Sequence, residues 1–109
     1  YKEGLARIPG LKLIEFDEME KCNWQYIVVE VGKEYPLSRD ELVEKLHANN
    51  ILARRYFWPG CHKMKPYSTL QPGTGLHLEE TEKVSRSIVV LPTGSNVSSE
   101  NIQQIVRLM

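Results

Sequence analysis

One short segment of the sequence gathers side chains that suit ligand binding. Two arginines, four aromatic residues and a histidine fall between residues 53 and 67. Side chains alternate between the two faces of a strand, so a strand here would place Arg54 and Tyr56 on one face. Arg55 and Phe57 would share the other face. A guanidinium beside an aromatic surface suits an anionic ligand that carries a ring, such as a nucleotide sugar.

The same segment also has a structural explanation, which the composition slightly favours. In an edge strand, the arginines would pair with nearby carboxylates and the rings would fill the core. His62 follows Pro59-Gly60 and is then a surface histidine; as a functional group it would donate or accept a hydrogen bond near neutral pH. We interpret His47, late in a predicted helix, and His77, just before another, as structural residues.

Familiar catalytic motifs are absent from the sequence. It contains no glycine-rich phosphate loop, no Gly-x-Ser-x-Gly nucleophile motif and no His-Glu-x-x-His zinc motif. Cys22 and Cys61 lie far apart, which predicts two reduced thiols rather than a disulfide framework. Cys61 and His62 lack the ligand spacing of a zinc site. We therefore assign no catalytic residue and no metal ligand.

The composition is that of a globular domain. The chain has 109 residues, of which 26% are charged and 41% hydrophobic, and this length predicts one domain. Fourteen basic residues balance fourteen acidic ones, so the chain lacks the positive charge that nucleic acids and anionic membranes attract. No apolar run approaches the ~20 residues of a membrane span, and no basic start followed by an apolar stretch predicts a signal peptide. We expect a cytoplasmic protein without nucleic-acid or membrane partners.

The periodicity of the apolar residues predicts an α+β fold. Strands are expected at 11–16, 24–31, 51–58 and 88–91, and helices at 1–8, 38–49, 78–87 and 98–109. The continuous run Ile27-Val28-Val29 suggests a strand buried on both faces. The expected architecture is a small sheet of three to four strands, antiparallel or mixed, with helices packed on it.

Two of these helices carry clear start signals. Ser38 and Glu41 have the spacing of a capping box, and Leu37 with Leu42 fits a hydrophobic staple. Ser98 is placed to cap the last helix. The connection from residue 61 to residue 76 is long for a compact domain, and such loops are often functional.

The order of several motifs identifies a family resemblance. The run from Ile51 to His62, followed by Pro66-Tyr67, resembles the C-terminal region of DegT/DnrJ/StrS-type aminotransferases. These enzymes use pyridoxal 5'-phosphate (PLP) to aminate keto sugars on nucleotide carriers. Further segments match the family pattern in order, namely 8–10, 23–29, 38–42, 89–94 and the closing helix. The resemblance therefore covers nearly the whole chain.

The resemblance implies a place within a larger enzyme. It is to the small C-terminal domain of fold type I PLP aminotransferases, so residues 1–109 would form that single domain and residues 1–8 the end of the interdomain helix. The chain begins at Tyr1 without an initiator Met, as expected for such a part. In the family, the large domain carries the Schiff-base lysine and most PLP contacts. Lys63 and Lys65 do not stand in that lysine's context, so we expect the chain alone to bind no PLP and to be inactive.

The resemblance also implies roles for individual residues. The family segment Arg-Tyr-Phe-x-Pro-x-x-His enters the substrate side of the pocket, and it maps to Arg55, Tyr56, Phe57 and His62 as substrate-binding residues. Gly60-Cys61 stands where many members have Leu or Ile. The parent enzyme would bind a nucleotide sugar and an amino donor such as glutamate, and would form a homodimer.

Two other functions fit the sequence. The chain could be a stand-alone nucleotide- or sugar-binding module that uses the Arg55-aromatic face without catalysis. It could instead be an interaction domain with no ligand, in which case an exposed apolar face would mark the missing partner.

Overall fold

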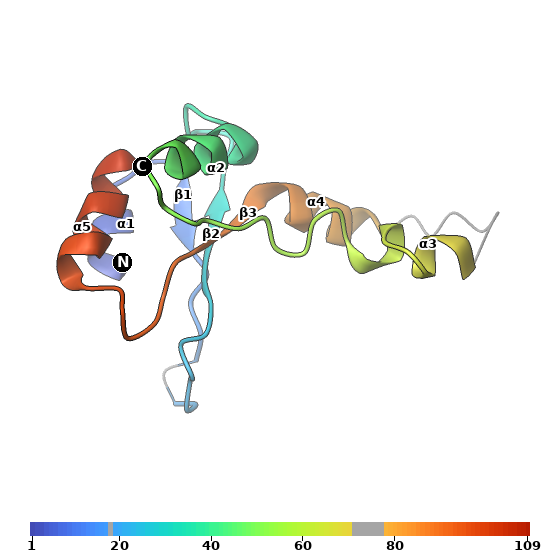
Figure 1. The fold of residues 1–109 in the computed structure, drawn as a ribbon, viewed down its shortest axis with the longest axis horizontal. Coiled ribbons are helices and arrows are strands. Elements are labelled where there is room, and N and C mark those ends of the chain that lie inside the picture. The colour runs from blue at the N-terminus through green and yellow to red at the C-terminus, as the bar shows by residue number, and fades with distance from the viewer. Residues whose placement is uncertain (18, 71–77) are drawn as a thin grey trace.

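A computed structural model describes residues 1–17, 19–70 and 78–109 (Figure 1). The elements in chain order are α1 (Lys2–Leu5), β1 (Leu11–Leu13), β2 (Ile27–Val31), α2 (Arg39–Ala48), the 3₁₀ turn η1 (Cys61–Lys63), α3 (Tyr67–Leu70), α4 (Glu79–Ser87), β3 (Ile88–Leu91) and α5 (Ser99–Leu108). The predicted residue His77 lies outside the described residues, as does part of the long connection.

The described strands form one antiparallel sheet in the order β1-β2-β3. Val29 is the central residue, opposite Leu13 on one side and Val89 on the other. A sheet of three strands with helices packed against it confirms the predicted α+β fold. Both outer strands begin near their predicted positions, but the ladder between β1 and β2 ends early. Trp24, with φ of 56°, has left the extended conformation that the sequence predicts for it.

The fourth predicted strand, at 51–58, is wrong. Only Arg54 pairs with the sheet, through a double hydrogen bond of 2.9 Å in each direction to Val90. Continuing this antiparallel register would place Leu52 opposite Pro92, which has no N–H to donate. It would also place Trp58 opposite Arg86, which belongs to α4. The segment therefore loses its extended partners on both sides of Arg54.

The core lies on one face of the sheet. Val29, Val89 and Leu91 point from the strands toward α1, α2 and α5, which supply Leu5, Leu42, Leu46 and Ile105 among others. Leu42 and Leu46 are fully buried. Ile27 and Val28 are only half-buried, so the prediction that this strand is buried on both faces is wrong. Among the described residues, the helices of the core cluster cover the face that carries Val29, Val89 and Leu91.

The capping signals explain where the two long core helices begin. The Ser38 side chain accepts from the Glu41 N–H at 3.3 Å, and the Glu41 carboxylate accepts from the Ser38 N–H at 2.7 Å. Ser98 and Asn101 form the same reciprocal pair at the start of α5. Asn50 then ends the α2 region with φ of 59°, a conformation that Asn tolerates. These local predictions are confirmed.

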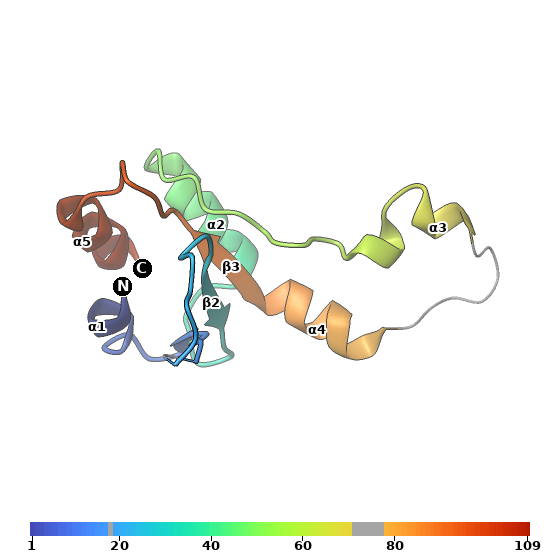
Figure 2. The ribbon, with the colours of Figure 1, turned by 90° about the horizontal axis from the view of Figure 1, so that it is seen from below.

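A long arm extends away from this core (Figures 1 and 2). The chain leaves the sheet after Arg54, passes through η1 and α3, and returns along α4 into β3. In both views the outgoing segment and α4 run side by side. The arm gives the molecule its elongated dimensions of 49 × 34 × 24 Å.

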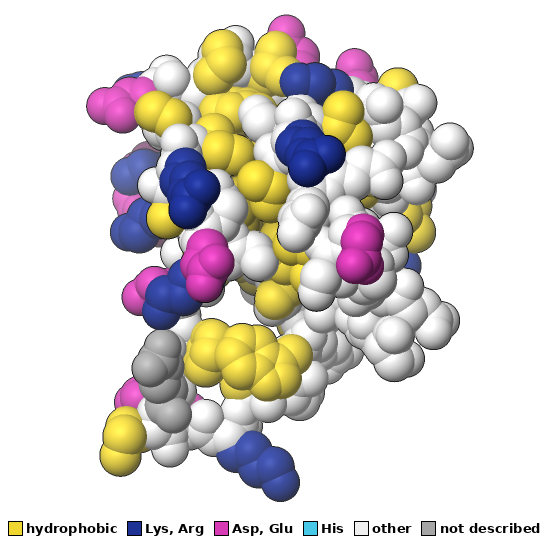
Figure 3. All heavy atoms as spheres, turned by 90° about the vertical axis from the view of Figure 1, so that its left-hand side faces the viewer, with side chains coloured by type: hydrophobic (Ala, Val, Ile, Leu, Met, Phe, Trp, Pro, Cys, Tyr) yellow, Lys and Arg dark blue, Asp and Glu magenta, His cyan; other side chains and the backbone are white. Residues whose placement is uncertain are grey.

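The surface carries both signs of charge, as the neutral net charge predicts. The face shown in Figure 3 interleaves acidic, basic and apolar side chains. None of the helices described in the structure is long and apolar enough to cross a membrane.

Candidate functional site

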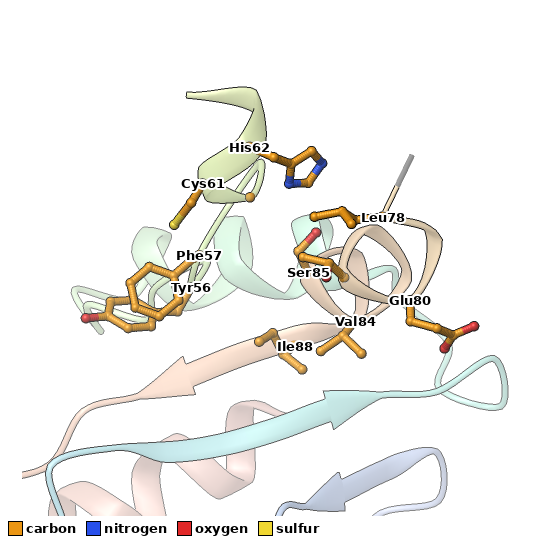
Figure 4. Close-up of a pocket in the computed structure, with 11 residues that line it drawn as sticks. Tyr56, Phe57, Cys61, His62, Leu78, Glu80, Val84, Ser85 and Ile88 are labelled. Atoms are coloured by element: carbon orange, nitrogen blue, oxygen red, sulfur yellow. The ribbon is translucent and has the colours of Figure 1, made fainter. Parts of the chain in front are cut away.

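A cleft of about 500 Å³ lies at the base of the arm (Figure 4). One wall is the segment that follows Arg54, and the other is α4 with the first residue of β3. Tyr56, Phe57 and His62 line the first wall, while Val84 and Ile88 line the second. Apolar side chains dominate the lining. Such a cleft suits a ligand with apolar faces and a few polar groups that fix its orientation.

His62 supplies one of those polar groups. Its side chain is 10% exposed, and its Nε2 lies 3.4 Å from Oε1 of Glu82 on α4. The ring lies directly against Gly60, where a Cβ would come within 2.7 Å of Cε1 of His62. Gly60 has φ of 102°, a conformation that residues with a Cβ rarely adopt. The prediction of a plain surface histidine therefore does not describe His62, because helix and loop both hold its ring.

The aromatic residues of the segment stack into a row that the sequence did not predict. The Tyr26 and Tyr56 rings are 5.0 Å apart, and the Tyr56 and Phe57 rings are 4.1 Å apart. The hydroxyl groups of Tyr26 and Tyr56 lie 2.8 Å from each other. This hydrogen bond, before the smaller effect of burial, raises the pKa of Tyr56. Tyr26, 30 residues upstream, has no signal in its own neighbourhood that would reveal this contact.

The structure places Arg55 outside the cleft. Its Nε donates to Asp40 at 2.5 Å, and its Nη2 lies 3.8 Å from Glu44. Both carboxylates belong to α2. The guanidinium is thus held by the core helix rather than presented beside Tyr56 and Phe57. Its role in substrate binding stays a prediction, whereas Tyr56, Phe57 and His62 are brought together.

The Asp40–Arg55 pair makes stability depend on pH. The hydrogen bond from Arg55, with a smaller effect of Arg39, lowers the pKa of Asp40 below its ordinary value of 3.8. The folded chain therefore binds a proton at Asp40 less readily than the unfolded chain. The pair's contribution is full above pH 3.8 and is lost as the pH falls through the lower pKa of the folded state.

We expect Asp40→Asn to remove this part of the acid sensitivity. Its effect on the free energy of unfolding is at most about 1 kcal/mol, because half-exposed pairs are screened by water. Urea midpoints at about pH 6 and about pH 3 measure it. Glu44→Gln, which alters the more distant carboxylate, is the control and keeps the sensitivity. An Asn variant that loses as much stability on acidification as the unsubstituted chain contradicts the prediction.

Arg39 is a buried residue that the sequence reasoning missed. Its residue exposure is 3%, and its guanidinium donates to the carbonyl oxygens of Ser85 at 2.7 Å and Ile88 at 3.1 Å. The same group lies 4.9 Å from the centre of the Trp58 ring. Arg39 therefore ties α2 to both walls of the cleft. Its position at the first helical residue, where the dipole disfavours a cation, is the signal that could have found it.

Of the two adjacent arginines, Arg54 is the one whose charge remains available. Its side chain is exposed, and no ion pair of Arg54 occurs among the described residues. It lines a second hollow of about 260 Å³ together with Tyr26, Tyr56 and Thr93. This places a guanidinium beside aromatic rings, the combination that the sequence predicted for an anionic ligand, at Arg54 rather than Arg55.

The possible metal ligands do not gather in the described ranges. In that part of the chain, no three His, Cys, Asp or Glu side chains are close enough to hold a metal ion. Cys22 and Cys61 are free thiols.

The family model described as the DegT/DnrJ/EryC1/StrS aminotransferase family matches residues 1–109. The chain belongs to this aminotransferase family. The resemblance drawn from the sequence is thereby confirmed, and the DegT/DnrJ/EryC1/StrS assignment extends over every element of the fold.

Curated relatives of this aminotransferase family include two bacterial enzymes. A dTDP-4-amino-4,6-dideoxy-D-glucose transaminase of Shigella dysenteriae is 30% identical over 106 residues, which are 97% of this chain and 28% of that protein. A transaminase of the same name from Escherichia coli is 27% identical over the whole chain and 29% of its own length. The chain spans less than a third of the curated relatives that it matches.

Solved structures show the same fold. The crystal structure of DesI, determined in the presence of its TDP-sugar product, has a TM-score of 0.84 and 34% identity over 99% of this chain and 27% of its own. A DegT/DnrJ/EryC1/StrS aminotransferase from Brucella abortus has a TM-score of 0.75 at 23% identity, covering 99% of this chain and 27% of its own. The α+β architecture with its arm is thus found in proteins several times longer.

The residues described here do not by themselves fit PLP, the cofactor that the family's aminotransferases imply. PLP chemistry needs a lysine for the Schiff base and a partner for the pyridine nitrogen. None of the described lysines lines the cleft. Lys63, the next residue after His62, places its Nζ 2.7 Å from Glu82.

Proposed function

We propose that the chain is the small C-terminal part of a PLP-dependent aminotransferase that converts a keto sugar nucleotide into an amino sugar nucleotide. In the longer protein, this part closes over the active site and orients the substrate. PLP and its Schiff-base lysine belong to the large domain, and residues 1–8 continue the helix that joins the two. The amino donor is an amino acid such as glutamate, and the enzyme is a homodimer.

The cleft at the base of the arm is the observation that carries this proposal. It places Tyr56, Phe57 and His62, three of the four expected substrate-binding residues, in one lining. The ring of Phe57 is more than half exposed, so it offers an apolar surface that a sugar or base can cover. Next to that surface, the imidazole of His62 can form a directional hydrogen bond with the ligand. The relatives' names support a thymidine diphosphate (dTDP) sugar as substrate.

Titration of the ¹⁵N-labelled chain with dTDP-glucose tests the proposal. We expect saturable chemical-shift changes at residues 56–62 and on the facing side of α4. Loss of the His62 hydrogen bond in His62→Ala weakens binding by about 3- to 10-fold. Phe57→Ala weakens it by about tenfold, because an aromatic contact is lost.

Lys83→Ala is the matched control for these variants. Lys83 also lies on α4, but its side chain is 77% exposed and does not line the cleft. We expect unchanged affinity for this variant. Shifts that are absent from the cleft at millimolar ligand, or that dTDP alone reproduces in full, would overturn the assignment of a sugar-binding role to the cleft.

The alternative, a stand-alone nucleotide- or sugar-binding module, would have to use a different cation from the one expected. Arg55 is held by Asp40 and Glu44, whereas Arg54 is available beside Tyr26 and Tyr56. Under this alternative, Arg54→Ala abolishes binding in the same titration and His62→Ala leaves it unchanged. The two variants therefore distinguish the two functions.

A further inference from the structure

Glu82 gathers three basic side chains at the rim of the cleft. Its Oε2 lies 2.7 Å from Lys63 Nζ and 3.1 Å from Arg86 Nη2, and its Oε1 lies 3.4 Å from His62 Nε2. We propose that Glu82 is the positioning residue that fixes the imidazole of His62 in one orientation at the cleft. The inference goes beyond the proposed function, because it concerns how His62 is held, and only its importance for substrate binding rests on that function.

The burial of Glu82 sets it apart from the neighbouring acids of its helix. Its side chain is 17% exposed, whereas that of Glu80 is 85% exposed. Acidic residues in a first helical turn are favoured by the helix dipole, which is sufficient reason for Glu80. The dipole does not require a carboxylate to be sheltered beside a histidine. A sheltered carboxylate is stable when several donors surround it, as Lys63, Arg86 and His62 do here.

Two of these three donors come from η1, so the cluster joins the two walls of the cleft. Lys63 and His62 approach from the turn, and Arg86 lies one helical turn after Glu82. The hydrogen bond from Lys63 is the largest of the effects that lower the pKa of Glu82. The carboxylate is therefore ionised at neutral pH and can accept from both elements at once.

Gly60 closes the opposite side of the imidazole. A Cβ at Gly60 would lie 2.7 Å from Cε1 and 3.0 Å from Nδ1 of His62. The ring is therefore confined between the backbone of Gly60 and the carboxylate of Glu82. Among the described residues, Glu82 is the charged group in contact with the ring, and Lys63 is bound to the same carboxylate. The side chains of Cys61, Glu80 and Ser85 belong to the same lining.

The contact with Glu82 determines which of the two ring nitrogens carries the proton. Because Glu82 is an acceptor, Nε2 carries the proton in the neutral ring and donates it to the carboxylate. Nδ1 is then an acceptor on the Gly60 side. A solvated neutral histidine is a mixture in which the Nε2–H tautomer already predominates, so an Nε2–H population without the minor form, together with a fixed ring position, reports whether Glu82 positions His62.

NMR of the full 109-residue chain tests this without any ligand. With ¹⁵N-labelled imidazole at a pH where His62 is neutral, we expect the Nε2–H tautomer and a cross-relaxation peak between His62 Hε1 and the Gly60 Hα protons. Glu82→Ala should abolish the peak and bring the tautomers to a mixture. Glu82→Gln, whose amide oxygen still accepts a hydrogen bond, should retain the tautomer in part and remains informative if the alanine variant is unfolded.

Glu80→Ala is the matched control, because Glu80 also lines the cleft but its carboxylate is exposed to solvent. Its Oε2 lies 3.7 Å from Nζ of Lys83. It should keep both the tautomer and the peak. The inference is overturned if Glu82→Ala and Glu82→Gln leave both signals unchanged, or if Glu80→Ala alters them as much.

A double-mutant cycle with dTDP-glucose connects the geometry to binding. We expect Glu82→Ala to weaken binding by about 3- to 10-fold alone and by less than about twofold in a His62→Ala background, because the two residues act as a unit. A measurable loss of affinity that is equal in both backgrounds would show that Glu82 does not act on binding through His62 and would overturn the inference. If the tautomer changes as expected but no variant binds differently, the proposed substrate role of the cleft fails while the positioning of His62 stands.

Discussion

Substitution of Arg39 by alanine is expected to lower the free energy of unfolding by about 3 kcal/mol. The guanidinium is nearly completely buried and donates to the Ser85 and Ile88 carbonyl oxygens. Alanine would leave both acceptors without that donor and would open a space beneath the Trp58 ring. The loss combines unmet hydrogen bonds, a missing cation–π contact and incomplete packing, none of which water replaces well in a closed site.

Urea denaturation at neutral pH measures this effect. Arg39→Lys should recover only part of the loss, because one ammonium group does not reproduce the planar fork that reaches two carbonyls and a ring. Arg107→Ala removes an exposed arginine from the last turn of α5 and should change stability by about 0.5 kcal/mol or less. A loss below about 1 kcal/mol for Arg39→Ala would contradict the role given to the buried guanidinium.

Arg39→Ala should also disturb the lining of the cleft. Ser85 and Ile88 belong to the cleft lining, and Arg39 holds their carbonyl oxygens at the junction between α4 and β3. In the folded fraction of the alanine variant, chemical-shift changes should therefore concentrate at this junction and at Trp58, far along the chain from residue 39. Changes confined to α2 would mean that Arg39 supports its own helix alone.

Local signals explain which parts of the fold were predictable. The starts of α2 and α5 follow from Ser38 and Ser98, whose capping interactions involve residues three positions away. The β-branched runs at β2 and β3 predict strands because their side chains fit a pleated, buried surface. Each of these predictions depends on residues that are neighbours in sequence, and each needs no knowledge of the tertiary fold.

The wrong predictions depend on partners that are distant in sequence. The aromatic segment after Ile51 has strand-like composition, but a strand also needs an extended neighbour. Pro92 on one side and the α4 helix on the other leave only Arg54 paired. Likewise, nothing near Arg55 indicates that Asp40, 15 residues earlier, will hold it on α2.

In the candidate site, too, some residues could be predicted from local sequence and others depend on distant partners. Tyr56, Phe57 and His62 could be selected because their types and spacing resemble the family segment. Glu82 and Arg39 could not, because their importance comes from burial that the arm creates when it folds back on itself. Sequence reasoning therefore found side chains that can touch a ligand and missed the residues that hold them in place.

Substitution of Gly60 by alanine is expected to have the largest effect on the site itself. The backbone there has φ of 102°, and the added Cβ would lie 2.7 Å from Cε1 of His62. The strained conformation costs about 1–2 kcal/mol of stability. The imidazole must also move, and it does so at the expense of its contact with Glu82. We expect dTDP-glucose binding at least about fivefold weaker, by loss of the His62 hydrogen bond.

Gly94 provides a matched control for the backbone strain. It has φ of 128°, and a Cβ added there would meet no atom within 4 Å. Gly94→Ala should therefore cost a similar amount of stability and leave binding unchanged. In a His62→Ala background the Cβ at position 60 no longer meets a ring, so Gly60→Ala should then cost no more stability than Gly94→Ala and should not weaken binding further. Equal stability losses for Gly60→Ala in both backgrounds, with unchanged binding in each, would show that His62 is free to move and that Gly60 matters only for the path of the chain.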